Sequence, residues 1–243
     1  MPSELFSARD IHAGYGRVQV LWGAGLSVNE AQTVVLLGMN GAGKTTLIKT
    51  IMGLIHQSKG TITFNGADLS HTRTDKRVRA GISYMSEVGC FPGLSVDENI
   101  RIGGQFMLPS ALHQRIGELY EIFPAIAARK NALASSLSGG QRKMVGIAKA
   151  LAGNPKLLIM DEPSAGLSPL LVQEVIEVLA RFRKEGISFL IAEQNVRFLE
   201  LADHVVTMSG GRMGFSGTVE AMRADDALRK AYFDIKGEHS NAG

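Results

Sequence analysis

A glycine-rich segment carries the residues best suited to chemistry in this chain. Glycine brings backbone N–H groups close to phosphate oxygens, Lys44 adds charge for the outer phosphates, and the Thr45 hydroxyl is placed to ligate Mg²⁺. The segment matches the phosphate-binding pattern G-x-x-x-x-G-K-[ST] at every fixed position; it comprises Gly38, Met39, Asn40, Gly41, Ala42, Gly43, Lys44, Thr45 and Thr46. An apolar run precedes it and a helix-like segment follows. We therefore expect a nucleotide-binding loop rather than a turn with a chance lysine.

Two adjacent carboxylates follow a second apolar run. Residues 157–160 are all apolar, and Asp161 and Glu162 come directly after them. A buried parallel strand delivers its next residues to the carboxyl edge of the sheet, where the phosphate loop also lies. There Asp161 could hold Mg²⁺, and Glu162 could face the water that attacks the γ-phosphate. A capping or turn role is the alternative.

A third segment predicts a second anion-binding helix end. Ser138, Gly139, Gly140 and Gln141 precede a stretch of helical spacing at 142–151. Ser138 is a good N-cap, and glycines at a helix start leave unpaired N–H donors. On its own, this pattern equally describes an ordinary capped helix after a flexible loop.

The elements that must position these residues alternate between strand and helix, which indicates an α/β fold with a parallel sheet. We expect strands at 5–11 (ended by 13–16), 26–28, 33–37, 61–64, 82–85, 157–160, 187–192, 204–208 and 212–216. Helices are expected at 47–54, 96–102, 109–123, 124–129, 142–151, 169–184, 196–202 and from 218, fraying at 238–243. No strand is expected between 87 and 155, so this segment predicts a mainly helical insertion.

Composition narrows the class of protein. The formal charge of +3 over 243 residues gives no strong case for nucleic-acid binding. The basic run at Arg73, Lys76, Arg77 and Arg79 is interpreted as a solvated loop or helix face. The single cysteine, Cys90, suits a reducing compartment. We also expect no signal peptide and no transmembrane span, hence a soluble protein.

The three segments, in this order, resemble the ATP-binding subunits of the ABC transporter superfamily. The resemblance covers essentially the whole length and implies one domain, 1–243, with an α/β core (1–86 and 156–243) and a helical subdomain (87–155). It further implies a phosphate-loop NTPase (RecA-like) core with an N-terminal antiparallel β portion. The implied cofactors are ATP and Mg²⁺. Tyr15 matches the aromatic residue that stacks on adenine, with a core tyrosine as the alternative.

Departures from the usual superfamily pattern point to a narrower family. Glu87 stands where a glutamine usually senses Mg²⁺, and Gln194 stands where a switch histidine is usual. The aspartate usual at Ser168 is also missing. Glu87, the segment 91–99, Glu162–Leu167 and the run Glu193-Gln194-Asn195 look like the ATPases of the branched-chain amino acid importer. A glutamine at position 194 is similar to the second of the two ATP-binding subunits of that importer. The sequence does not determine the intrinsic rate of ATP hydrolysis with a glutamine at this position.

The resemblance also implies partners. A second ATPase subunit, identical or different, would bring its residues 138–141 onto the ATP held by Lys44 of the first. Integral membrane permease subunits, and indirectly a periplasmic or surface binding protein, complete such systems at the cytoplasmic face of the inner membrane. The apolar tip 91–94 is our candidate for the permease contact, or else core. Urea or amide import, lipopolysaccharide-type export, a non-transport ABC ATPase and a phosphate-loop kinase are the alternatives.

Overall fold

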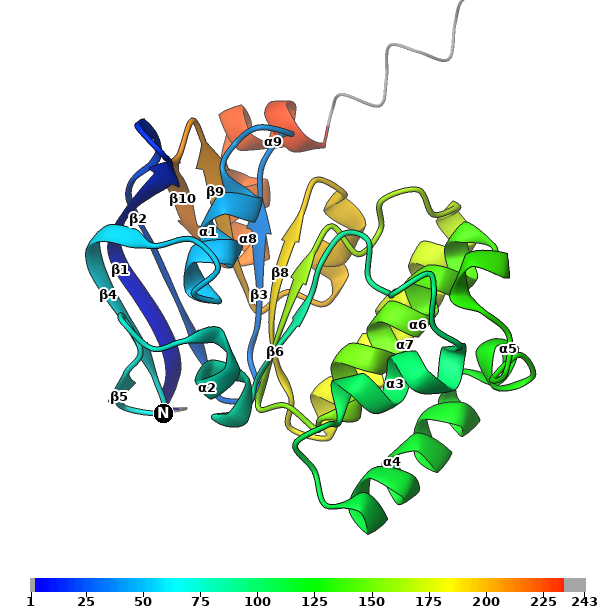
Figure 1. The fold of residues 1–243 in the computed structure, drawn as a ribbon. Helices are drawn as coiled ribbons and strands as arrows, with labels where there is room; N and C mark the ends of the chain where they lie inside the picture. Colours follow the sequence, from blue (N-terminus) through cyan, green and yellow to red (C-terminus); the bar gives the residue numbers. More distant parts are fainter. Residues whose placement is uncertain (1–2, 234–243) are drawn as a thin grey trace, which may run out of the picture.

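A six-stranded sheet forms the centre of the molecule (Figure 1). The computed structural model describes residues 3–233. The strand order is β10 (Arg212–Gly217), β9 (His204–Ser209), β3 (Thr33–Leu37), β8 (Ser188–Glu193), β7 (Leu157–Asp161) and β6 (Ile82–Met85). Strands β9, β3, β8, β7 and β6 run parallel, and β10 closes one edge antiparallel as the return arm of a hairpin. The predicted parallel sheet is confirmed.

An antiparallel sheet covers one side of the molecule. Its order is β2 (Val18–Asn29), β1 (Glu4–Tyr15), β4 (Gln57–Phe64) and β5 (Ala67–Asp68). The sequence interpretation ended the first strand too early, because pairing with β2 carries it on to Tyr15, opposite Val18. The break comes instead at Gly16, whose φ of 57° suits glycine. The same pairing extends the short strand expected at 26–28 back to Val18.

Alternating side chains of the buried strands feed two separate cores. In β3, Val34 and Leu36 pack with helix α1 (Lys44–Ile51) and the antiparallel sheet. Val35 and Leu37 face the opposite way, into a core shared with the long helices. A strand buried on both faces therefore needs apolar residues at every position, as 33–37 nearly has.

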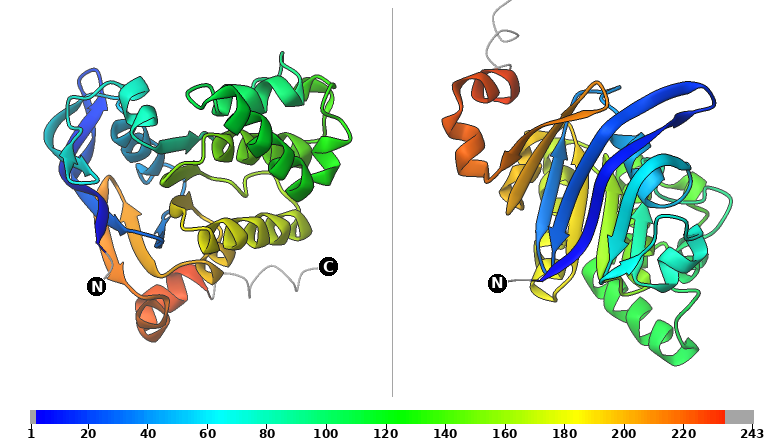
Figure 2. Two further views of the ribbon diagram at one scale, coloured as in Figure 1. Left: turned by 90° about the horizontal axis from the view of Figure 1, so that it is seen from below. Right: turned by 90° about the vertical axis from the view of Figure 1, so that its left-hand side faces the viewer.

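A helical insertion connects β6 to β7 along the chain. It lies on the side of the molecule away from the antiparallel sheet (Figures 1 and 2). It contains α3 (Val96–Gly103), α4 (Pro109–Ile122), α5 (Pro124–Ala127), the 3₁₀ turn η1 (Ala134–Ser136) and α6 (Gly139–Ala152). Residues 86–156 are all described and contain no β-strand. Helix α7 (Pro169–Lys184), predicted with these same bounds, shares the core of the insertion.

One basic residue does not lie where the sequence interpretation put it. Arg77, on α2 (Thr74–Arg79), is only 2% exposed. Its guanidinium donates hydrogen bonds to the carbonyls of Thr72 (2.8 Å), Thr50 (3.3 Å) and Ile51, which ends α1. The expectation of a solvated face is wrong at this position because the orphan carbonyls at a helix end attract a cation.

The C-terminal part is partly different from the expectation. Residues 196–202 were expected as an α-helix, but Val196–Glu200 forms the 3₁₀ helix η2. Two short helices, α8 (Val219–Ala224) and α9 (Asp226–Tyr232), follow β10 as the helical tail predicts. The fraying expected at 238–243 lies outside the described residues. Among residues 3–233, no helix combines the length and apolar character that crossing a bilayer requires.

Candidate nucleotide site

The phosphate loop lies between β3 and α1 and lines an open cavity of about 440 Å³. Gly43 caps α1 with a φ of 107°, and Gly41 has a φ of 79°. A Cβ on Gly38 would come within 2.7 Å of the Met208 carbonyl. These glycines permit a turn that other residues would strain or block. Because no side chain caps α1, its first N–H groups remain available to an anion.

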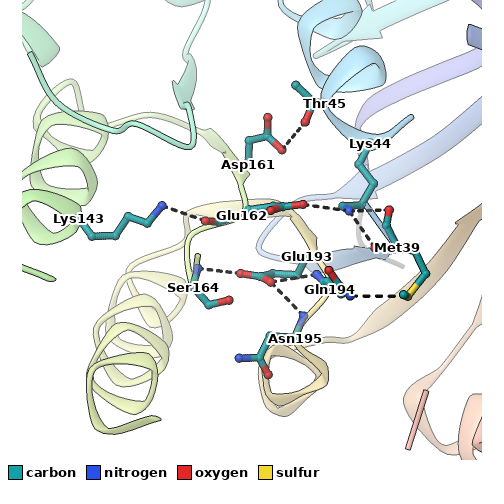
Figure 3. Close-up of polar contacts among 11 residues, drawn as sticks. Met39, Lys44, Thr45, Lys143, Asp161, Glu162, Ser164, Glu193, Gln194 and Asn195 are labelled. Carbon is teal, nitrogen blue, oxygen red and sulfur yellow. Dashed lines mark hydrogen bonds and ion pairs between the residues drawn. The ribbon is translucent and has the colours of Figure 1, made fainter. Parts of the chain in front are cut away.

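Lys44 and Glu162 meet at the centre of the site (Figure 3). The Lys44 ammonium is 3.1 Å from Glu162 Oε1 and donates to the carbonyls of Gly38 (2.8 Å) and Met39 (3.2 Å). Lys44 is only 3% exposed. A phosphate can bind this buried ammonium by taking the place of the Glu162 carboxylate, so that the charge of Lys44 stays neutralised.

The two candidate metal ligands next to the loop are in direct contact. The Thr45 hydroxyl donates to Asp161 Oδ1 at 3.1 Å, and Asp161 is 2% exposed at the end of β7. Burial raises the pKa of Asp161, and the hydrogen bond from Thr45 lowers it in part. Asp161 is the last residue of β7, and its role as a metal ligand stays a prediction. Oxygen ligands in this pair suit Mg²⁺, which prefers hydroxyl and carboxylate oxygens.

Glu87 lines the same cavity as Thr45. It follows β6 and lines the cavity together with the phosphate loop and Glu162. Its position is compatible with the metal-sensing role that the resemblance implies, and that role stays a prediction.

The backbone of Glu162 has an unusual conformation. Its φ is +49°, in the left-handed region that non-glycine residues rarely adopt. The Glu162 N–H donates to the Ala192 carbonyl at 2.9 Å. On the other side, the Glu162 carbonyl accepts from Ala165 N–H at 3.1 Å and from Lys143 Nζ at 2.9 Å. The capping or turn alternative does not account for a side chain that faces Lys44.

Gln194 lines a second cavity, of about 560 Å³, together with Met39, Asn40 and Glu162. The buried carboxylate of Glu193, just before it, accepts from the N–H groups of Ser164 (2.8 Å), Gln194 (3.0 Å) and Asn195 (3.0 Å). One carboxylate thus joins the loop after β7 to the loop after β8. Gln194 is thereby held next to the phosphate loop.

Two predicted segments do not reach this site. Among the residues that the structure describes, neither cavity is lined by Ser138, Gly139, Gly140 or Gln141. Ser138 caps α6 in a capping box with Gln141, as its N-cap prediction requires. Tyr15 does not line the cavities either; it is 51% exposed, so the core alternative is wrong and stacking on adenine stays a prediction.

Lys143 and Glu193 are the functional candidates that sequence reasoning missed. Both are buried and both bind backbone atoms of the catalytic loops. A charged residue on the apolar face of the 142–151 helix was a signal for Lys143. No local signal distinguishes Glu193 from Glu162 or Glu87, because its partners come from another loop.

The phosphate loop, the carboxylates after β7 and the capped helix α6 together define a nucleotide-binding phosphate-loop ATPase. Comparison with known families makes the class specific: the family model described as ABC transporter matches residues 21–165. The chain belongs to the ATP-binding subunits of this family, and it is an ATPase coupled to transport.

Relatives in two transport systems are similar along nearly the whole chain. The high-affinity branched-chain amino acid transport ATP-binding protein BraG of Pseudomonas aeruginosa is 34% identical, over 90% of this chain and 94% of BraG. The lipopolysaccharide export system ATP-binding protein LptB of Haemophilus influenzae is also 34% identical, over 94% and 96%. A probable branched-chain amino acid transport protein, LivF of Archaeoglobus fulgidus, is 30% identical over 93% and 97%.

Solved structures agree with this fold. The ADP conformation of MJ1267, an ATP-binding cassette of an ABC transporter, superimposes with a TM-score of 0.81 at 26% identity. The superposition covers 94% of this chain and 98% of MJ1267. The predicted α/β fold with an antiparallel portion and a helical insertion is confirmed.

Proposed function

We propose that this chain is the ATP-hydrolysing subunit of an ABC importer for branched-chain, hydrophobic amino acids. Two branched-chain amino acid transport ATPases, BraG and LivF, match the chain nearly end to end. The run Glu193-Gln194-Asn195 supports the same assignment. Its first residue, Glu193, accepts a hydrogen bond from Ser164 N–H and so joins the two loops. The observation that carries the proposal is the joined site of Lys44, Asp161, Glu162 and Gln194 in a chain with these relatives.

Hydrolysis is assigned to the residues around the phosphate-loop cavity. Lys44 and the loop amides would bind the β- and γ-phosphates, and Thr45, Asp161 and Glu87 would hold Mg²⁺. Bound there, Mg²⁺ would neutralise charge on the phosphate oxygens. Gln194 would donate a hydrogen bond to the γ-phosphate, without the charge that a histidine can carry.

Glu162 is the proposed general base or water-orienting residue. Its Oε1 is 3.1 Å from the Lys44 ammonium, so its carboxylate already lies beside the position of the outer phosphates. When a phosphate takes over Lys44, the Glu162 carboxylate loses its ion-pair partner and becomes free to accept a proton from water. Such a base contributes about 10²–10⁴-fold to the rate.

A second ATPase subunit would complete the site. Residues Ser138 and Gly139 are exposed at the N-terminus of α6, away from the cavity of their own chain. A head-to-tail partner would bring this helix end onto the ATP of the first subunit, where its N–H groups bind phosphate oxygens.

The permease contact is assigned to the start of the helical insertion. Val88 is 70% exposed and Phe91 is 49% exposed, so the core alternative is wrong for Phe91. Exposed apolar side chains on one surface suit a protein partner. In this assignment the chain works at the cytoplasmic face of the inner membrane, together with permeases and a substrate-binding protein.

Lipopolysaccharide export is the second candidate, because LptB proteins match the chain as extensively as BraG does. Reconstitution separates the two. The chain is purified with the membrane subunits that accompany it and reconstituted in liposomes, with a Lys44→Ala complex as the control. ATP-driven leucine uptake that Lys44→Ala abolishes supports the proposal. Permeases that extract lipopolysaccharide and move no amino acid would refute the amino acid assignment and leave the ATPase intact.

A further inference from the structure

We propose that Lys143 is a positioning residue that fixes the catalytic carboxylate to the helix bearing residues 138–141. Its ammonium donates one hydrogen bond to the Glu162 carbonyl, at 2.9 Å, and one to the Glu87 carbonyl, at 2.8 Å. Figure 3 shows Glu162 between Lys143 on one side and Lys44 on the other. This inference rests on the proposed role of Glu162 as the base.

Burial of the Lys143 ammonium is unfavourable unless its hydrogen bonds compensate for the lost hydration. The residue lies on α6, two positions after Gln141, and is only 5% exposed. Among the described residues, none of the ion pairs within 4.0 Å includes Lys143. Burial lowers the pKa of Lys143, and four carboxylates farther away, on Glu87, Glu193, Glu162 and Asp161, raise it in part. A buried cation bound to carbonyls is retained where those carbonyls need a fixed position.

The backbone that Lys143 holds is the strained one. A non-glycine residue in the left-handed region is strained, and it persists only where surrounding contacts hold it. At Glu162 these contacts are the N–H bond to Ala192 and the carbonyl bonds from Ala165 and Lys143. Ala192 and Ala165 belong to β8 and to the turn after β7, so Lys143 is the contact that comes from the helical insertion.

The geometry gives the site a mechanical connection. Any shift of α6 moves the Lys143 ammonium, and with it the carbonyls of Glu162 and Glu87. One carbonyl belongs to the proposed base and the other to the segment that leads into the exposed permease-facing residues. Binding of a partner to residues 138–141 would therefore change the position of Glu162, the proposed general base, in the same chain.

The test is Lys143→Met, with Lys149→Met as the matched control. Both lysines lie on α6, but the Lys149 ammonium covers the Phe91 ring at 4.5 Å and has no bond to Glu162. For Lys143→Met we expect kcat to fall about 10–100-fold, as a small displacement of a reacting group does. We expect the Kd for ATP to stay within about 3-fold, because the phosphate loop is untouched. Lys149→Met should change neither quantity in the isolated protein.

A double variant separates positioning from general damage. In a Glu162→Gln background, single-turnover hydrolysis should show no further loss on adding Lys143→Met, because Lys143 acts through Glu162. Multiplying losses, an unchanged kcat, or a parallel loss of ATP affinity would overturn the proposal. Lys143→Leu, which like methionine has no donor, repeats the measurements should Lys143→Met not fold, and the same three results decide. If Glu162→Gln by itself left turnover unchanged, the assignment of Glu162 as the base would fail.

Discussion

At the scale of single residues, the site is organised around the charge of Lys44. Glu162 and two loop carbonyls satisfy this buried ammonium. A triphosphate offers stronger, charge-assisted hydrogen bonds than the carbonyls do. In the proposed mechanism, binding and activation are thereby linked, because the phosphate that attracts Lys44 would also release the Glu162 carboxylate, the proposed base.

Glu162→Gln tests this link. The amide keeps the size of the side chain and can still accept a hydrogen bond from Lys44, but it cannot take a proton. We expect ATP hydrolysis to fall about 10²–10⁴-fold while ATP affinity changes little. Steady-state kinetics and equilibrium binding of ATP measure the two quantities. Unchanged turnover would remove Glu162 from the mechanism.

At the scale of elements, α1 carries Lys44 and Thr45 at one end and depends on a distant residue at the other. Arg77, on α2, donates hydrogen bonds to the carbonyls of Thr50 and Ile51 in the last turn of α1. It also donates to the Thr72 carbonyl, just before α2. These bonds join α1 to α2. The helix that presents the phosphate-binding residues is thus fixed at the end away from the nucleotide.

Arg77→Met should destabilise the fold. It removes the guanidinium donor from the carbonyls of Ile51 and Thr72, while the Thr50 carbonyl keeps its bond from Gly53 N–H. Each buried group left unsatisfied costs about 1–3 kcal/mol. Denaturant unfolding of Arg77→Met should show a clear drop in the free energy of unfolding. Arg73→Met removes an arginine from the same run whose side chain is 84% exposed, and it should change stability little. Equal effects of the two substitutions would contradict the buried role.

The β9–β10 hairpin gives a pH prediction. Burial lowers the pKa of His204 below its usual value of 6.5, and its Nε2 is 2.8 Å from Ser216 Oγ. The unfolded chain therefore binds more protons at this residue than the folded chain does. Stability contributed by the neutral His204 is present above about pH 6.5 and decreases as pH falls through that value toward the lowered pKa.

His204→Gln should remove this part of the pH dependence. Unfolding midpoints of wild type and variant, measured between pH 7.5 and pH 5, should show a smaller acid loss in the variant. The other histidines contribute to both proteins alike and cancel in the comparison. Parallel curves would contradict the assignment of the shift to His204.

At the scale of the whole molecule, the two helix ends that are predicted to bind anions do not share a cavity. The N-terminus of α1 lines the phosphate-loop cavity, and residues 138–141 at the start of α6 line neither cavity of the described chain. A nucleotide held by one copy and covered by the other uses both ends. Dimerisation would then require bound ATP, and the dimer should accumulate in a variant that binds ATP without hydrolysing it.

Gly139→Glu tests the dimer. A Cβ on Gly139 meets no atom within 4 Å, so the monomer should fold normally while the new carboxylate repels the facing triphosphate. In the Glu162→Gln background, size-exclusion chromatography with ATP should show a dimer, and Gly139→Glu should abolish it. Gly117→Glu, an equally open helical site in α4, is the control and should leave the dimer intact. A dimer that survives Gly139→Glu would argue against the head-to-tail arrangement.

Local sequence was sufficient for elements whose neighbours impose little. Strands 33–37 and 82–85 and helix 169–184 have the predicted bounds. The apolar run 34–37 and Ser168–Pro169 at the helix start specify the first and the last of these locally. The long hairpin of β1 and β2 was cut short, since its ends are fixed by cross-strand pairing. Residues 196–200 form a 3₁₀ helix, and its N-cap Asn195 is held by the Glu193 carboxylate, a contact that the local sequence does not display.

The sequence by itself determined the phosphate loop, the two carboxylates after β7, the capped helix at Ser138 and the family to which they belong. Their chemistry depends on residue types at fixed spacing, which a chain displays without folding. Only the tertiary structure decided that Lys44 pairs with Glu162, that Arg77 is buried, and that Lys143 and Glu193 bind the backbone of the loops around the cavity. These partners are far apart along the chain, and no local pattern specifies which carbonyl a buried charge will meet.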